Sequence, residues 1–354
     1  MYLNFDEITK IQIDHTSRCN LACPQCARIV DGKTVNPSMP ITDLTLDDYR
    51  ILLEPFGKDN RVVLFHCGNY GDVLVSPTFD ETFEYSINHP GVKKIRIATN
   101  GSARTPEWWS NLAKLGGDRL NVIFSVDGLR DTNHIYRVGS NFEKIMENAQ
   151  AFIDAGGIAE WAYIEFKHNY TQIEQAESLA KKMGFVKFSA KYTARFAEQD
   201  QKSLETRKGT VVEEKENQNT RDKIDIRKKF SSFDEYVENA PITCKYKRDK
   251  TVFVDMCMRL WPCCWMGAPK YFNTKTPQTA SFEHLFSLYG EDFNDMRQHG
   301  WDVLNHEYYT DYLERSWNNR DDKFKRIYTC GRTCGDKFEF SSGHGKNIKS
   351  EDLK

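Results

Sequence analysis

The first 190 residues alternate between two hydrophobic periods, and this alternation limits the fold more than any other feature of the sequence. Short runs rich in β-branched and aromatic residues predict six strands, at 8–13, 61–66, 94–98, 120–126, 161–166 and 186–190. Helical patterns lie between several of them, with Thr45, Thr105, Asn141 and Thr171 as N-caps. Such alternation produces parallel βαβ units with right-handed crossovers. Six units are too few for a closed eight-stranded barrel, so the sequence predicts an α/β fold with an open, partial (β/α)6 barrel.

Composition excludes two classes of protein. The chain has 354 residues, with 49 basic and 51 acidic side chains and a net charge of −2, so no global basic field indicates a nucleic-acid partner. No stretch approaches the ~18 apolar residues of a spanning helix, and the acidic start, MYLNFDEITK, does not resemble a signal peptide. We therefore expect a cytoplasmic protein without a membrane partner, whose thiols are reduced.

The cysteines of the chain are clustered. They are Cys19, Cys23, Cys26, Cys67, Cys244, Cys257, Cys263, Cys264, Cys330 and Cys334. Disulfide scaffolds are short secreted chains, whereas clustered cysteines in a cytosolic protein more often bind metal. The sequence therefore favours metal sites over thiols scattered in a core.

Cys19, Cys23 and Cys26 form a C-x3-C-x2-C triplet directly after the first predicted strand. Three thiolates this close together can bind one face of a metal cluster, but they do not supply four ligands. A [4Fe–4S] cluster held by three cysteines leaves one iron open, which is the condition for binding and activating a substrate there. The alternative is a zinc ion that takes a remote fourth ligand.

Polar and glycine-rich turns follow the next predicted strands. They are Gly68-Asn69-Tyr70-Gly71-Asp72, Thr99-Asn100-Gly101, Ser125-Val126-Asp127-Gly128 and Lys167-His168-Asn169, with Arg137 and Gly139 beyond the third of these. Each alone could be only a turn. In this order, at the ends of parallel strands where ligands of β/α folds bind, they predict one binding site.

The triplet, the six βα units and these turns together resemble the radical S-adenosylmethionine (SAM) superfamily over roughly residues 5–195. The resemblance implies a cluster held by Cys19, Cys23 and Cys26 that binds SAM at its open iron and cleaves it to methionine and a 5′-deoxyadenosyl radical. The SAM contacts it implies are Gln25, Gly68, Asn69, Tyr70, Gly71, Asp72, Thr99, Asn100, Gly101, Ser125, Asp127, Arg137 and Lys167. Tyr70 and Asp72 stand where the family usually has Gly and Glu, and Gln25 stands where it usually has an aromatic residue. We expect His66 and Cys67 to be packing residues.

The rest of the chain divides by composition. We predict a barrel domain at 1–200, a charged linker at 201–236, a small α+β domain at 237–345 and a mobile tail at 346–354. The linker is expected to be an exposed loop or a charged surface helix. The segment from Pro241 to Gly267 predicts a β-hairpin that carries cysteines, and 281–325 predicts helices.

Four C-terminal cysteines, Cys244, Cys263, Cys330 and Cys334, form a complete ligand set. They resemble the twitch domain, a shorter relative of the SPASM domain, and the resemblance implies a second, auxiliary [4Fe–4S] cluster. Cys263 is favoured over its neighbour Cys264 as the ligand, and Cys257 is expected to be a packed thiol. A four-cysteine zinc site is the alternative, because the residue types alone do not distinguish the two metals.

These features predict a radical SAM oxidoreductase or modifying enzyme. The expected substrate is a peptide or protein side chain, with dehydrogenation of a small alcohol or amine as the alternative. The expected electron donor is an external protein of the flavodoxin or ferredoxin type. A different class, a two-site zinc protein that serves as a binding module, would draw its support from the basic stretch Lys245–Arg248, which we expect to be a solvated hairpin end.

Overall fold

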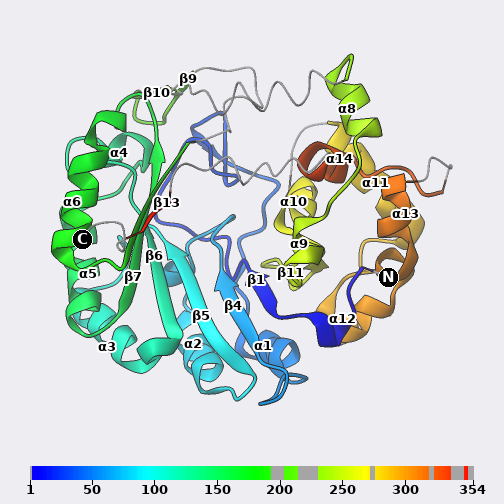
Figure 1. Cartoon of the computed structure of the whole chain (residues 1–354), viewed down its shortest axis with the longest axis horizontal. Helices are drawn as coiled ribbons and strands as arrows, with labels where there is room; N and C mark the ends of the chain where they lie inside the picture. The colour runs from blue at the N-terminus through cyan, green and yellow to red at the C-terminus, as the bar shows by residue number, and fades with distance from the viewer. Residues whose placement is uncertain are drawn as a thin grey trace.

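A computed structural model describes residues 2–192, 203–213, 230–271, 276–318, 323–335 and 347–349. All six predicted strands are present and lie side by side in one parallel sheet. They are β1 (Lys10–Ile13), β4 (Val62–His66), β5 (Val92–Thr99), β6 (Leu120–Ser125), β7 (Ile158–Glu165) and β8 (Lys187–Tyr192), in that spatial order. The sheet curves as an open barrel wall (Figure 1). The expected α/β fold with a partial barrel is confirmed.

The sheet continues past both ends of the predicted six strands. Strand β11 (Thr251–Val254) pairs parallel with β1, and β12 (Leu260–Trp261) pairs antiparallel with β11. At the other edge β13 (Asn347–Lys349) pairs antiparallel with β8. The mobile tail expected at 346–354 therefore contains a short strand, while its other residues lie outside the described ones. The pairing of β11 with β12 is the hairpin that the sequence predicts, whereas the pairings of β11 with β1 and of β13 with β8 were missed because they join distant parts of the chain.

Helices cover the outer face of the barrel wall (Figure 1). They are α1 (Leu46–Leu53), α2 (Phe79–Asn88), α3 (Pro106–Gly116), α5 (Phe142–Asp154) and α6 (Ile173–Met183). The short helix α4 (Asn133–Tyr136) lies at the carboxyl ends of the strands, where Tyr136 packs against Phe166. Thr45, Thr105 and Asn141 accept the expected capping bonds from backbone N–H groups. Thr171 does not cap α6, because it lies inside a 3-10 turn and Gln172 takes the N-cap position.

Residues on the parallel strands alternate between two faces. On β7 every second residue, such as Trp161 and Tyr163, is fully buried beneath the helices, and the residues between them are half-buried. The half-buried set faces the inside of the barrel, because the helices lie on the other side. The inner face is therefore less enclosed than the outer one.

Part of the expected charged linker is ordered sheet. Strands β9 (Ser203–Glu205) and β10 (Val211–Glu213) form a hairpin, and Val212 is fully buried against Tyr136 and Phe166. The prediction of an exposed loop or surface helix is thus wrong for 203–213, because Val212 packs against apolar side chains near the end of β7. Residues 214–229 lie outside the described ones, and the domain limits near 200 and 237 remain predictions.

The C-terminal segment packs beside β1 and surrounds a separate pocket. Its helices are α8 (Phe233–Asn239), α9 (Lys245–Arg248), α10 (Cys264–Gly267), α11 (Pro277–Tyr289), α12 (Met296–His299), α13 (Leu313–Asn318) and α14 (Tyr328–Cys334). The predicted hairpin exists as β11–β12, but Lys245–Arg248 forms helix α9 rather than a hairpin end. A third small hairpin, β2 (Ile29–Val30) with β3 (Thr34–Val35), follows the cysteine triplet. No helix in the described part of the chain is long and apolar enough to cross a membrane.

Candidate active site

The cysteine triplet lies in the loop that leaves β1, at the carboxyl ends of the parallel strands. Cys19, Cys23 and Cys26 are all half-buried. Cys19 Sγ accepts a hydrogen bond from the Leu21 N–H at 3.4 Å and lies 3.8 Å from the Asn100 amide nitrogen. Burial raises the pKa of Cys19 to about 12 and that of Cys23 to about 11, and the other thiols of the triplet add to the rise. A nearby cation would reverse this effect, because it favours the thiolate.

Asp72 joins two of the predicted turns. Its carboxylate accepts hydrogen bonds from the Thr99 hydroxyl at 2.9 and 3.0 Å, from the Asn100 N–H at 2.7 Å and from the Leu74 N–H at 3.1 Å. Burial raises the pKa of Asp72, and these bonds oppose the rise. The carboxylate therefore fixes Asn100, which in turn bonds Asn20 at 3.0 Å beside Cys19.

Asp127 and Arg137 form a buried ion pair that reaches the triplet. Arg137 Nε donates to Asp127 Oδ2 at 2.6 Å, and Asp127 Oδ1 accepts the Ile164 N–H at 2.7 Å. The remaining guanidinium edge lies 4.0 Å from Cys23 Sγ. Although burial opposes its charge, the pKa of Arg137 is raised by Asp127 and then by Cys23. A fixed positive charge thus stands beside one thiol of the triplet.

The glycines of the second turn allow it to approach the triplet loop. A Cβ on Gly71 would lie 2.3 Å from the Thr16 carbonyl oxygen and 2.6 Å from that of Arg18. Gly68 has a φ of +66°, which favours glycine. Between them, the Asn69 N–H donates to Asp14 at 2.7 Å, and Tyr70 is buried against Phe253 and Tyr271. Tyr70 thus packs between the barrel and the C-terminal segment.

The other predicted site residues differ in how near they lie to the cysteine triplet. Gln25 is half-buried within the triplet, and Ser125 is half-buried at the end of β6. Gly101, at a φ of +73°, packs so closely on Phe124 that a Cβ would lie 2.7 Å from its ring. Lys167 is exposed and forms an ion pair with Glu213 of β10, so the structure does not bring it to the triplet.

Asparagines hold the site together, and of these Asn20 and Asn133 were missed by sequence reasoning, whereas Asn169 lies in a predicted turn. Asn133 Oδ1 accepts the Asp127 N–H at 2.8 Å, and the Asn169 side chain donates to the Asp127 carbonyl at 2.8 Å. Both are fully buried, and Asn20 joins Asn100 as described above. For Asn20 and Asn169 the available signal was their position in a loop that follows a strand, whereas Asn133 begins helix α4 and gave no such signal.

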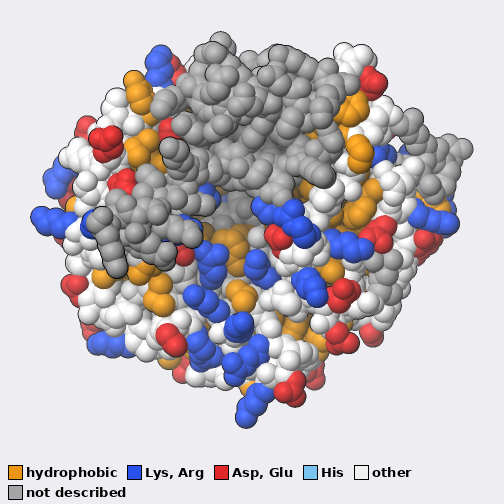
Figure 2. Space-filling view, viewed as in Figure 1, with side chains coloured by type: hydrophobic (Ala, Val, Ile, Leu, Met, Phe, Trp, Pro, Cys, Tyr) orange, Lys and Arg blue, Asp and Glu red, His pale blue; other side chains and the backbone are white. Residues whose placement is uncertain are grey.

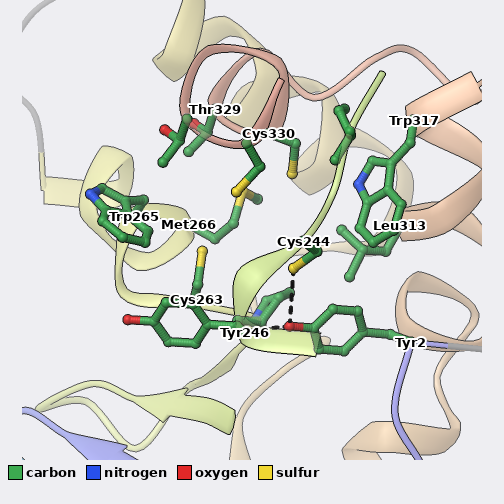
Figure 3. A pocket seen from close by; sticks show the side chains of 14 residues that line it. Tyr2, Cys244, Tyr246, Cys263, Trp265, Met266, Leu313, Trp317, Thr329 and Cys330 are labelled. Atoms are coloured by element: carbon green, nitrogen blue, oxygen red, sulfur yellow. Dashed lines mark hydrogen bonds between the residues drawn. The ribbon is translucent and has the colours of Figure 1, made fainter. Parts of the chain in front are cut away.

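The four predicted C-terminal ligands line one apolar pocket. Cys244, Cys263, Cys330 and Cys334 share it with Tyr2, Met266, Leu313 and other mostly apolar side chains. Figure 3 shows the sulfur atoms of Cys244, Cys263 and Cys330 facing a common space. Tyr2 contacts Cys244 Sγ through its hydroxyl at 3.6 Å. Burial raises the pKa of each of these three thiols, to well above the usual value for Cys263 and Cys330.

Two other cysteines of this segment lie outside the pocket. Cys264 points to Tyr246, whose hydroxyl lies 3.2 Å from the sulfur and also donates to Gln12 at 2.6 Å. Cys257 lies in the turn of the β11–β12 hairpin and is partly buried. In the described ranges no three Cys, His, Asp or Glu side chains are placed to hold one metal ion.

The chain is similar to known proteins in sequence and in fold. Residues 13–183 match the family model of the Radical SAM superfamily. The AdoMet-dependent heme synthase of Methanosarcina barkeri is 28% identical over 175 residues, 49% of this chain and 47% of that protein. The chain therefore matches about half the length of this curated relative.

Solved structures extend the likeness of fold to nearly the whole chain. A hexahistidine-tagged form of anSMEcpe with bound AdoMet has a TM-score of 0.54 at 12% identity, covering 98% of this chain and 91% of that one. Native anSMEcpe with bound AdoMet and Kp18Cys peptide has a TM-score of 0.53 at 13% identity, covering 98% and 94%. The sheet thus has the radical SAM fold, and residues 13–183 are similar in sequence to the Radical SAM superfamily.

Proposed function

We propose that the protein is a radical SAM oxidoreductase or modifying enzyme. The observation that carries the proposal is the position of the triplet. Cys19 and Cys23 lie at the carboxyl ends of parallel strands, between the Asp72–Asn100 bonds and the Arg137–Asp127 pair. Three thiols of one loop, beside a cation and an amide donor, suit a cluster with one open iron.

The residues present fit a [4Fe–4S] cluster and SAM. The donor set is three cysteines of one loop, and the Leu21 N–H and Asn100 amide lie near the Cys19 sulfur, where they can donate hydrogen bonds to it. The turn from Gly68 to Asp72 packs directly on the backbone of this loop, which keeps it in place. The cluster and SAM, when bound, would supply one-electron cleavage of SAM and a hydrogen-abstracting radical.

The protein's own residues then have definable tasks. Arg137 holds a positive charge next to Cys23 and lowers the cost of the thiolate there. Asp72 fixes the backbone of Asn100, so the amide side chain stays between Asn20 and Cys19. Gln25, Ser125 and the glycines of the turns are proposed to border SAM. Lys167 is proposed for that role by resemblance only, since its amine pairs with Glu213.

We extend the proposal to a second cluster in the C-terminal segment, of the twitch or SPASM type. Its support is that Cys244, Cys263, Cys330 and Cys334 line one pocket while Cys257 and Cys264 do not. Four thiols in an apolar pocket suit a fully ligated cluster with a structural or electron-transfer role. Cys244, Cys263 and Cys330 pack against the main hydrophobic core, whereas Cys23 and Cys26 pack against two smaller clusters.

The proposed substrate is a peptide or protein side chain, and the alternative is a small alcohol or amine. A peptide substrate is supported by the fold neighbour that was solved with a peptide, and a small molecule by the curated heme synthase. The proposal includes an external flavodoxin- or ferredoxin-type donor and a reducing, cytoplasmic compartment. Reduced thiols are required before either group of cysteines can bind a metal.

Anaerobic reconstitution tests the function directly. The full chain, reconstituted with iron and sulfide, is expected to turn brown and to release 5′-deoxyadenosine from SAM when dithionite is added. Deuterium from candidate substrates is then followed into 5′-deoxyadenosine by mass spectrometry. A colourless protein that binds zinc at both sites and never cleaves SAM would refute the proposal in favour of a binding module.

A further inference from the structure

The inner face of the barrel wall is unusually cationic. Five of its half-buried side chains are basic, namely Lys10, Lys94, Arg96, Lys187 and Lys191. Among the inward residues of β1 and β4 to β8, as far as the structure describes them, Glu160 is the one acid. The chain as a whole carries slightly more acidic than basic residues, so composition does not explain this gathering.

Glu160 forms ion pairs with two of these cations. Arg96 lies 3.4 Å and Lys187 lies 3.8 Å from its carboxylate oxygens. The side chains of Arg96 and Lys187 keep about a third of their surface exposed, at 34% and 36%. One carboxylate therefore faces several positive charges that remain accessible from inside the barrel.

Lys191 has no ion-pair partner among the described residues. Burial lowers its pKa first and the charge of Lys187 lowers it next, Glu160 opposes this by raising it, and Arg96 and Lys245 lower it further. Lys245 belongs to α9 of the C-terminal segment, whose neighbour Tyr246 bonds Gln12 on the inner face of β1. The charged region thus extends from β8 across the inside of the barrel toward α9. Figure 2 shows Lys and Arg side chains gathered over the middle of the molecule in this view.

We propose that Arg96, Lys187 and Lys191 bind anionic oxygen groups of the substrate, either carboxylates or phosphates. The proposal rests on the proposed function, in which the substrate reaches the triplet from inside the barrel. Like charges held together in a partly desolvated space repel each other, and a bound anion relieves that repulsion. Arg96 Nε and Nη2 donate to Asn121 and Glu160, so Arg96 offers its positive charge and its remaining guanidinium donors. The two lysines supply point charges, so a ligand with more than one anionic group fits best.

The test uses simple anions on the full, reconstituted chain. Tricarballylate supplies carboxylates, pyrophosphate supplies phosphates, and the triamide of tricarballylate is the uncharged match. Binding is measured by calorimetry without SAM or reductant. We expect at least one anion to bind and the triamide not to bind, with an affinity that falls as salt is added. The anion that binds more tightly identifies the substrate's charged group.

Matched variants locate the site. Lys191→Gln and Lys187→Gln are each expected to weaken anion binding about tenfold or more, because each removes a charged hydrogen-bond donor. Lys182→Gln removes the same charge from the exposed face of α6 and is expected to have little effect. Glu160→Gln is expected to tighten binding, since it removes the internal competitor for Arg96 and Lys187. Lys191→Met is a second variant without the charge. Circular dichroism spectra of this variant and of the parent show whether weaker anion binding comes from a folding defect.

Unchanged affinity in folded Lys187→Gln and Lys191→Gln proteins would overturn the inference, as would binding of the triamide equal to that of the acid. Weaker binding in Glu160→Gln would also overturn it. SAM cleavage by dithionite is measured on the same preparations without added anion. If the parent protein does not cleave SAM, the proposed function is refuted. If it cleaves SAM but binds no anion, only this inference is refuted.

Discussion

The two cysteine groups differ in what surrounds them. The N-terminal triplet lies among polar groups, with Arg137, Asn100 and backbone N–H donors near its sulfurs. The C-terminal four line a pocket whose other walls are mostly apolar, including Met266 and Leu313. A polar site with three protein ligands suits a metal that must bind and release a substrate. An apolar site with four protein ligands suits a metal that has no open coordination position. Variants in the two cysteine groups are therefore expected to differ in SAM cleavage and in iron content.

The largest effect is expected at the triplet. Cys23→Ser is expected to reduce 5′-deoxyadenosine release to background, because the remaining two thiols no longer hold a cluster with an open iron. Reductive SAM cleavage by dithionite is measured by chromatography. Cys257→Ser, which lies outside both groups, serves as the control and should keep full cleavage. A Cys23→Ser protein that still cleaves SAM would end the assignment of the triplet.

Removing the N-terminal triplet is expected to halve the iron content of the protein. The parent chain should carry about eight irons after anaerobic reconstitution, as two four-iron clusters. The variant with Cys19, Cys23 and Cys26 all changed to Ala should retain about four, in the C-terminal pocket. Iron and acid-labile sulfide are measured together. A parent protein that never exceeds about four irons would contradict the second cluster.

A smaller, selective effect is expected in the C-terminal pocket. Cys334→Ser should lose the iron of that site yet keep SAM cleavage without transfer to substrate, since the triplet is untouched. Cys264→Ser is the matched control, because Cys264 faces Tyr246 instead of the pocket. Circular dichroism is recorded for both, because loss of a metal can unfold a small segment. Full product formation by a folded Cys334→Ser protein would refute the division of tasks.

The smallest effect is expected at Asp72. Asp72→Ala should weaken SAM binding about ten- to a hundredfold while the iron content stays unchanged, because Asn100 loses its fixed position. Affinity is measured by equilibrium dialysis with the reconstituted protein. Asp118→Ala removes an exposed carboxylate beside the barrel and is the control. Unchanged SAM affinity in Asp72→Ala would show that the bond network around Asn100 does not serve the cofactor.

The sequence alone determined the barrel and the triplet. The six strands and three of the four helix caps could be predicted because each depends on neighbours within a few residues, as at Thr105 and Asn141. The spacing of Cys19, Cys23 and Cys26 is equally local. The order of the turns at the strand ends also followed, because parallel strands bring their carboxyl ends to one edge.

Only the tertiary structure decided how distant residues meet. It brought Cys244 and Cys263 to Cys330 and Cys334, and it turned Cys264 away toward Tyr246. It joined β11 to β1 and turned the central part of the expected linker into a hairpin that buries Val212. It also placed Lys191 and Arg96 on one inner face. Adjacent residues such as Cys263 and Cys264 are equivalent in sequence, and only the direction of the backbone and the packing around it distinguish them.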